Sequence, residues 1–432
     1  MKRLSFHIFF TFLLAIAVHA QETVYPAPRQ TQPILITNAT VHVGNGQVLN
    51  NTSIEIKDGK ITQIGSGIAS SGAQVIDAGG KQVYPGLILS VTNLGLVEVP
   101  SVRASNDLTE IGDLNPSIRS IVAYNTDSKV INTLRPNGIL LANIVPQGGI
   151  ISGSSSVVQL DAWNYEDAAY KMDNAINLYM PSLMPRPQRL AAFLGTQQTD
   201  PVKEGLEQLD KLKAFFHEAK AYSEAPVHEE TNLKFNAVKG LFNHAQKLFV
   251  HANTVKQMLL AIDFVKEFGF DVVIVGGADS WQIADLLKQN NIAVILTQPH
   301  TLPILEDDDI EQPYKTPALL QKAGVLFAIT DVDGETRGRN LAFNAGTAAA
   351  YGLTKEQALA SITLNAAKIL GVADKTGSIE VGKDANLFIC NGDALDMRTN
   401  IITDAFIQGR QVSLDNKQKQ LFEKYKYKYG LK

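Results

Sequence analysis

The sequence has a single cysteine, Cys390, among its 432 residues. One thiol can form neither an intramolecular disulfide nor a cysteine-based zinc site. Charge is also sparse, because 39 Lys and Arg against 43 Asp and Glu leave a net charge of −4 and only 19% of the residues are charged. This balance gives no sign of the basic surface that a nucleic-acid-binding protein needs. With 45% hydrophobic residues, the composition predicts a globular protein with a large core.

Long hydrophobic runs are absent except near the amino terminus. A basic start at residues 1–3 precedes an apolar stretch at 4–18, and small residues follow at positions 18 and 20. An apolar run of about 15 residues is shorter than the roughly 20 that a membrane-spanning helix needs. The pattern therefore predicts a secretory signal peptide over residues 1–20. We expect an exported protein, periplasmic or secreted, that has no membrane span after cleavage.

Strand patterns mark both ends of the chain after this segment. Residues 21–33 are rich in Pro and Gln and predict a linker. Residues 34–84 contain β-branched runs broken by glycine turn sequences, and residues 371–415 again have a strand pattern. We expect one composite β-sandwich domain from 34–84 and 371–415. The basic, amphipathic tail at 416–432 predicts either a solvated helix or a helix that docks on a partner.

Between these ends, apolar runs alternate with amphipathic stretches over residues 85–370. The runs include 139–145 and 292–297, and Thr354 and Gln357 form a helix-capping pattern near the end of the region. Apolar strands that alternate with helices indicate a parallel sheet covered on both faces. The expected fold is α/β, a (β/α)₈ TIM-like barrel with a small β-sandwich, and a doubly wound sheet is the alternative.

A glycine-rich stretch follows the apolar run 139–145. It contains Gly148, Gly149 and Gly153 but lacks the lysine and the spacing of a P-loop. On a barrel it would lie at the carboxyl ends of the strands, where binding residues gather. It is therefore either a substrate loop or a tight turn after a strand.

Four stretches together carry a family resemblance. They are YPGLI at 84–88, VHAN at 250–253, FAITD at 327–331 and the long run at 361–389. The chain resembles the amidohydrolase superfamily, in particular its imidazolonepropionase-related branch. The resemblance implies a metal-bearing barrel that hydrolyses a non-peptide C–N bond in a cyclic amide or a small peptide-like substrate.

Such chemistry depends on a metal, which lowers the pKa of bound water from 15.7 to about 7 and usually takes three protein ligands. In the family, the first strand ends in a His-x-His pair, but here Val91 and Asn93 stand at those positions and no His-x-His occurs in the chain. A third family histidine falls on Gly276 or Gly277. The resemblance thus implies a divergent member whose metal site is degenerate.

The resemblance carries over two ligands. His251 matches a metal histidine, and Asp331 matches the aspartate that binds the metal and accepts the proton of the water. His300 is a third, weaker candidate because it follows the strand pattern at 292–297. The alternatives are a buried, hydrogen-bonded histidine for His251, a loop histidine for His300, and an ion-paired carboxylate for Asp331.

Two functions remain open from the sequence. One is a hydrolase that uses zinc or another divalent metal and Asp331 as general base. The other is a catalytically inactive barrel without a metal that binds a ligand or a partner. In both cases we expect a small-molecule substrate or ligand. A homo-oligomer or a pairing with an active paralogue is compatible with either function.

Overall fold

The computed structural model describes residues 25–183, 200–227, 230–303, 307–334 and 336–431. The expected signal peptide at 1–20 and the first part of the expected linker lie outside the described residues. No helix within the described ranges is long and apolar enough to cross a membrane. Because the expected signal peptide lies outside the described residues, export stays a prediction.

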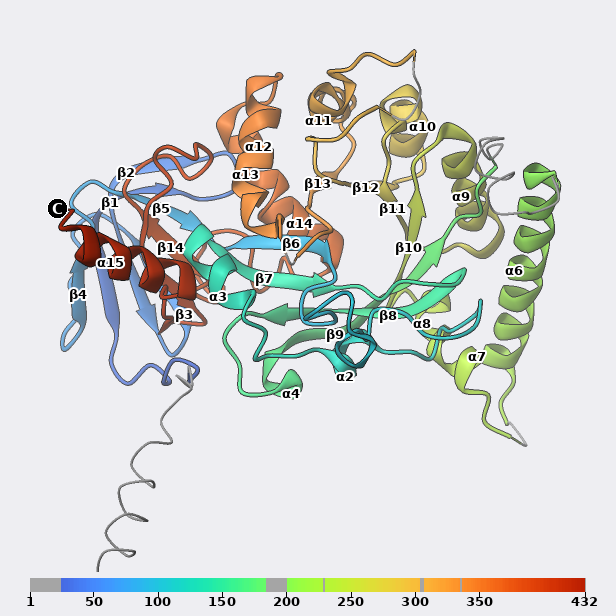
Figure 1. The fold of residues 1–432 in the computed structure, drawn as a ribbon, viewed down its shortest axis with the longest axis horizontal. Coiled ribbons are helices and arrows are strands. Elements are labelled where there is room, and N and C mark those ends of the chain that lie inside the picture. The colour runs from blue at the N-terminus through green and yellow to red at the C-terminus, as the bar shows by residue number, and fades with distance from the viewer. Residues whose placement is uncertain (1–24, 184–199, 228–229, 304–306, 335, 432) are drawn as a thin grey trace, which may run out of the picture.

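One sheet is built from both ends of the chain, as the strand patterns predict (Figure 1). Strand β14 pairs with β5 in antiparallel fashion, so that Leu387 lies opposite Pro85. A separate hydrophobic core fills this part of the molecule. The strands, from one edge to the other, are β16 (Arg410–Gln411), β15 (Ile402–Ile407), β14 (Leu387–Cys390), β5 (Gln82–Pro85), β1 (Ile34–His42), β2 (Val48–Lys57) and β3 (Lys60–Gly65), with β4 (Gln74–Asp77) paired to β1.

The second sheet curves into a nearly closed eight-stranded barrel, which confirms the expected fold class. Apart from the strand at 169–179, whose first half is partly exposed, its strands are buried along their whole length or nearly so, as strands covered on both faces should be. In order they are β13 (Phe327–Ile329), β12 (Ala293–Leu296), β11 (Val272–Gly276), β10 (Lys247–Ala252), β9 (Ala169–Tyr179), β8 (Ile151–Gln159), β7 (Ile139–Ile144) and β6 (Leu87–Thr92).

One strand departs from the regular alternation of strands and helices. β8 runs antiparallel to both β7 and β9, so three consecutive strands form a meander where a regular barrel would have crossover helices. The chain reverses between β7 and β8 at Gly148 and Gly149, which have φ of +92° and +66°. Because β8 is rich in serine, its sequence lacks the apolar run by which the other strands can be recognised.

Side-chain hydrogen bonds link the two edge strands of the barrel. The Oγ1 of Thr330 donates to the carbonyl of Val91 at 3.0 Å and accepts from the amide of Val91 at 3.1 Å. One hydroxyl thus joins the end of β6 to the residue that follows β13. This hydroxyl thus links the two edge strands by hydrogen bonds, as backbone groups link the other neighbouring strands of the sheet.

Helices lie along the outside of the barrel and in the connections between its strands (Figure 1). The predicted cap of α13 is present, since Thr354 and Gln357 form a reciprocal capping box. The tail forms α15, which begins after Asn416 and has no buried residue. The α-helices are α2 (Ser120–Ala123), α3 (Ile131–Leu134), α4 (Tyr165–Ala168), α6 (Pro201–Glu224), α7 (Leu233–Ala237), α8 (Lys239–Phe242), α9 (Val255–Phe268), α10 (Ala284–Gln289), α11 (Gln312–Ala323), α12 (Leu341–Ala350), α13 (Lys355–Ser361), α14 (Leu364–Leu370) and α15 (Lys417–Tyr429).

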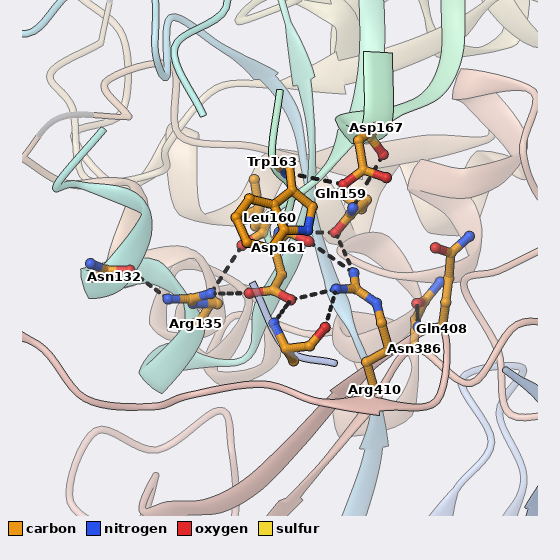
Figure 2. Close-up of polar contacts among 11 residues, drawn as sticks. Asn132, Arg135, Gln159, Leu160, Asp161, Trp163, Asp167, Asn386, Gln408 and Arg410 are labelled. Atoms are coloured by element: carbon orange, nitrogen blue, oxygen red, sulfur yellow. Dashed lines mark hydrogen bonds and ion pairs between the residues drawn. The ribbon is translucent and has the colours of Figure 1, made fainter. Parts of the chain in front are cut away.

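A buried ion network connects the two sheets (Figure 2). Asp161, just after β8, lies 2.7 Å from Nη1 of Arg135 through one oxygen and 2.6 Å from Nη1 of Arg410 through the other. The second oxygen also accepts from the backbone amide of Ala27 at 2.9 Å. The side chains of Asp161 and Arg135 are only 2% and 3% exposed. Burial lowers the pKa of Arg135, and Asp161 opposes this effect.

Replacing Asp161 by Asn should destabilise the fold severely, because Arg135 would be left buried without its counter-charge. We expect the free energy of unfolding to fall by about 3–5 kcal/mol, measured by urea denaturation. The matched control is Asp396→Asn, which removes an exposed pair with Arg398 and should leave the denaturation midpoint almost unchanged. Equal midpoints for the two variants would contradict the role given to Asp161.

A histidine links the terminal sheet to helix α13. His42 on β1 lies 2.7 Å from Oε1 of Glu356 on α13 through Nδ1, and 2.9 Å from Oε1 of Gln82 through Nε2. Its ring stacks on Tyr84 at 4.3 Å. Both ring nitrogens can donate to these oxygens only in the protonated ring. Burial lowers the pKa of His42, but the hydrogen bonds to Glu356 and Gln82 outweigh it and raise the pKa above its ordinary value of 6.5.

This shift predicts a pH dependence with a definite sign. The folded protein binds the His42 proton more tightly than the unfolded chain, so the stabilisation is complete below about pH 6.5 and is lost as the pH rises through the raised pKa. The difference in unfolding free energy between the wild type and His42→Gln should therefore be larger at pH 6 than at pH 9. A difference that grows with pH would overturn this assignment.

Candidate functional site

The carboxyl ends of the barrel strands hold the two residues that the resemblance singles out. His251 is near the end of β10, and Asp331 follows β13. In barrels of this type, binding residues gather at this face.

His251 is held by its neighbours on β9. Its ring stacks on Tyr179 at 4.0 Å, and its Nε2 lies 3.2 Å from Oδ1 of Asn177. Since that oxygen can only accept, Nε2 carries the proton and Nδ1 is the acceptor nitrogen. Burial lowers the pKa of His251 to about 3. The ring is therefore neutral at physiological pH, and only Nδ1 has a lone pair to offer a ligand.

Asp331 is a buried carboxylate, with 2% of its surface exposed. One oxygen accepts from the amide of Asp333 at 3.2 Å and lies 3.7 Å from Nε of Arg337, and the other is 3.4 Å from Nδ2 of Asn344. Burial raises its pKa, while the charge of Arg337 opposes the rise. The neighbourhood of Arg337 fits the ion-paired alternative for this residue and also suits a carboxylate that exchanges protons.

The contacts of His300 are with residues of α11 and α12 and not with His251 or Asp331. Its side chain is exposed, its Nε2 is 2.9 Å from Oγ1 of Thr347 on α12, and its ring is 5.6 Å from that of Tyr314 on α11. Among the described residues, no group of three or more His, Cys, Asp or Glu side chains is placed to hold a metal ion. His251, His300 and Asp331 thus do not form a three-ligand site in this structure.

Val91 and Asn93 stand at the first-strand positions that carry histidines in the family. Both make hydrogen bonds that hold neighbouring parts of the chain. Val91 is buried and bonded through its backbone to Thr330. The Oδ1 of Asn93 accepts from the amide of Gly334 at 3.0 Å. The one polar side chain of this pair is therefore engaged in holding the loop after β13.

The end of β11 has no room for a histidine in this arrangement. Gly276 has a φ of +103°, and a Cβ built on it would lie 2.3 Å from Oδ1 of Asn253. At Gly277, with a φ of +59°, a Cβ would lie 2.7 Å from Cγ1 of Val294. Both the backbone conformation and the neighbouring side chains favour glycine.

The glycine-rich stretch packs closely against the loop that follows β6. A Cβ on Gly149 would lie 2.6 Å from the carbonyl oxygen of Gly112, and one on Gly153 would lie 2.4 Å from that of Ile118. A Cβ on Gly148 would meet Thr109 at 3.2 Å. These contacts account for the glycines by backbone packing, as in the tight-turn alternative.

Sequence reasoning missed Asn177 and Tyr179, the residues that set the protonation and orientation of His251. Their signal is the register of parallel strands, in which Tyr179 pairs with His251. That register becomes visible only when β9 is recognised as the neighbour of β10.

A small cavity of about 50 Å³ that opens to solvent lies at the same face, at the carboxyl ends of β11, β12 and β13. Gly276 and Ile329 are on its wall, as are residues of the loop after β12 and of α11. It is the kind of concave, largely apolar space that small ligands occupy.

Known proteins resemble this chain in sequence and in fold. A family model described as "Amidohydrolase family" matches residues 207–412. Imidazolonepropionase of Rhizobium rhizogenes is 25% identical over 390 residues, which cover 82% of this chain and 90% of the relative. Imidazolonepropionase of Thermoplasma volcanium is 24% identical, with 88% and 90% covered. Amidohydrolase tasK of Hapsidospora irregularis is 20% identical, but this chain spans only 38% of its length.

The fold agrees with these matches. The crystal structure of an amidohydrolase from Thermotoga maritima superposes with a TM-score of 0.75 and 25% sequence identity, covering 88% of this chain and 99% of the other. A similarity that extends over almost the whole of both chains includes the barrel and the sheet built from both ends.

The environment of His251 leads to a titration test. With a pKa of about 3, the ring should remain uncharged at pH 5 in an NMR titration of labelled histidine. The unfolded chain would protonate this residue below about pH 6.5, so stability should be lost as the pH falls below that value, by up to about 2 kcal/mol at pH 5. His251→Gln should show a smaller loss. Protonation of His251 in the folded protein near pH 6.5 would refute this description.

Proposed function

The chain belongs to the amidohydrolase superfamily, in the imidazolonepropionase-related branch, and we propose that it hydrolyses a C–N bond other than a peptide bond. The proposed substrate is a cyclic amide or a small peptide-like molecule. The observation that carries the proposal within the site is Asp331, a buried carboxylate with a raised pKa at the carboxyl end of the barrel. Its proposed role is to accept and return a proton during the reaction.

The described residues do not fit a tightly held hydrolytic metal. Only the Nδ1 of His251 and the carboxylate of Asp331 remain of the ligands expected from the family, and a catalytic zinc usually has three. The carboxylate also lies near Arg337, whose positive charge opposes a cation. These residues would therefore hold a metal only weakly.

A second candidate is a catalytically inactive barrel that binds a small molecule or a partner, such as an active paralogue. One observation favours it: the lost ligand positions are replaced by bonds and contacts that hold the site together. Asn93 binds Gly334, and the Asn253 side chain occupies the space beside Gly276. This interpretation treats the barrel mouth as a stable binding surface.

Metal dependence separates the two candidates. The purified, dialysed protein should contain less than one equivalent of zinc by elemental analysis, because two donors hold a metal weakly. Hydrolysis of a panel of hydantoins, lactams and N-acyl amino acids should then require added Zn²⁺ or Mn²⁺. Asp331→Asn should lower kcat by about 10²–10⁴-fold with a smaller change in KM.

The matched control is Asp271→Asn, which changes an exposed aspartate just before β11, at the opposite end of that strand, and should leave kcat unchanged. Hydrolysis that Asp331→Asn does not slow would contradict the proposed role of Asp331, and hydrolysis that survives a chelator would contradict the expected metal requirement. A protein that hydrolyses no member of the panel with any metal, but whose Tm rises with one of them, would support the inactive barrel.

A further inference from the structure

Helix α15 lies on the surface of the molecule, at the end that holds the terminal sheet (Figure 1). The side chain of Asn416 caps its first turn by accepting from the amide of Lys419 at 2.8 Å, and Gly430, with a φ of +62°, ends it. None of its 13 residues is buried. A helix this short is only marginally stable by itself in water. A surface that covers its apolar side chains would therefore stabilise it.

One face of α15 carries a stripe of aromatic and aliphatic side chains. Residues three and four positions apart share a face of a helix. This spacing aligns Leu421, Phe422, Tyr425 and Tyr429, which are 39%, 64%, 47% and 65% exposed. The rings of Tyr425 and Tyr429 stack at 6.3 Å along this face. The stripe is thus continuous and open to solvent.

Lysines border the stripe on both sides. The same helical spacing places Lys417, Lys424 and Lys428 along one border and Lys419 and Lys426 along the other. Glu423, the one acidic residue of the helix, lies on the opposite face. In the described part of the chain no lysine of α15 is ion-paired, and the paired lysines are Lys60, Lys213, Lys315, Lys355 and Lys383.

The charge of this face indicates what covers it. Residues 416–432 contain six lysines and one glutamate, although the whole chain has a net charge of −4. A second copy of α15 would bring like charges together along both borders of the stripe. A polyanion such as a nucleic acid would pair with the lysines but would leave Leu421 and Phe422 in water. An anionic bilayer offers both a negative surface for the lysines and an apolar layer for the stripe.

We propose that α15 binds the surface of a bilayer that contains anionic phospholipid, with its axis parallel to that surface. Leu421 and Phe422 enter the boundary between the headgroups and the acyl chains, and the tyrosine hydroxyls stay at the level of the headgroups. The lysine stems extend along the apolar side chains while their ammonium groups reach the phosphates. This surface is separate from the barrel mouth, so the inference goes beyond the proposed function and does not depend on it.

Binding to vesicles tests the proposal. The protein is produced without residues 1–20, so that the expected signal peptide cannot bind lipid, and its partition is measured by co-sedimentation. Vesicles with about one-third phosphatidylglycerol should take up the protein at least about tenfold better than vesicles of phosphatidylcholine alone, and added salt should reduce this difference. Replacing Lys424 and Lys428 together by Gln should lower the partition coefficient by about 10–30-fold, and Phe422→Gln should lower it by about 5–20-fold.

The matched control replaces Lys211 and Lys220 together by Gln. It removes two exposed lysines from α6, at the far end of the molecule (Figure 1), and should change the partition coefficient by less than about twofold. Since α15 has no buried residue, its variants should keep the wild-type Tm, and circular dichroism identifies any that fail to fold.

Several results would overturn the proposal. They are equal uptake by the two kinds of vesicle, no uptake by either, and an equal loss in the control and in the variants of α15. Self-association in sedimentation velocity, or binding to an oligonucleotide, without uptake by vesicles would instead assign α15 to a second copy or to a nucleic acid. Because no hydrolysis is measured, the failure of this proposal and that of the proposed function are distinguishable.

Discussion

The carboxylate of Asp161 joins three parts of the chain that are distant in sequence. It is bonded to Arg135, before β7, to Arg410 on β16, and to the backbone of Ala27. The carboxylate and the guanidinium group of Arg135 are removed from water there, and that of Arg410 is largely buried. This burial costs free energy unless each charge keeps its partner. The position of the terminal sheet against the barrel depends on this network, since Arg410 belongs to the sheet and Asp161 follows a barrel strand. Loss of the carboxylate would leave two cations close together in a dry environment.

At the mouth of the barrel, hydrogen bonds also join segments that are distant in sequence. Residues at the family's ligand positions here make bonds that hold loops and strand ends. Thr330 links β13 to β6 through Val91, and Asn93 holds Gly334. These hydrogen bonds join strand ends and loops at the mouth of the barrel. The side chain of Asn93 is held by its bond to Gly334. A metal ligand at this position would therefore require both a different residue and a different arrangement of the loop after β13.

Local patterns predicted much of the fold, because they reflect the neighbours of each residue along the chain. The capping pair Thr354 and Gln357 and the apolar strand at β7 are examples. The antiparallel strand β8 was missed because its buried serines find polar partners across the sheet: Ser155 bonds Asn174. The contacts of the site depend on tertiary structure in the same way. The hydrogen bond between His251 and Asn177 spans 74 positions, and the one between Arg410 and Asp161 spans 249.

A glycine at one of the two positions to which the resemblance assigns a histidine also shapes the cavity at this face. Gly276 ends β11, excludes a side chain on its own backbone, and lies on the cavity wall. A histidine there would bring a titratable ring next to the aliphatic side chains of Leu296 and Ile329 on this wall. With glycine, the polar character of this wall comes from Asp279 and Gln298, which follow β11 and β12. Because Gly276 adds no side chain, the cavity beside it stays open at the ends of β11, β12 and β13.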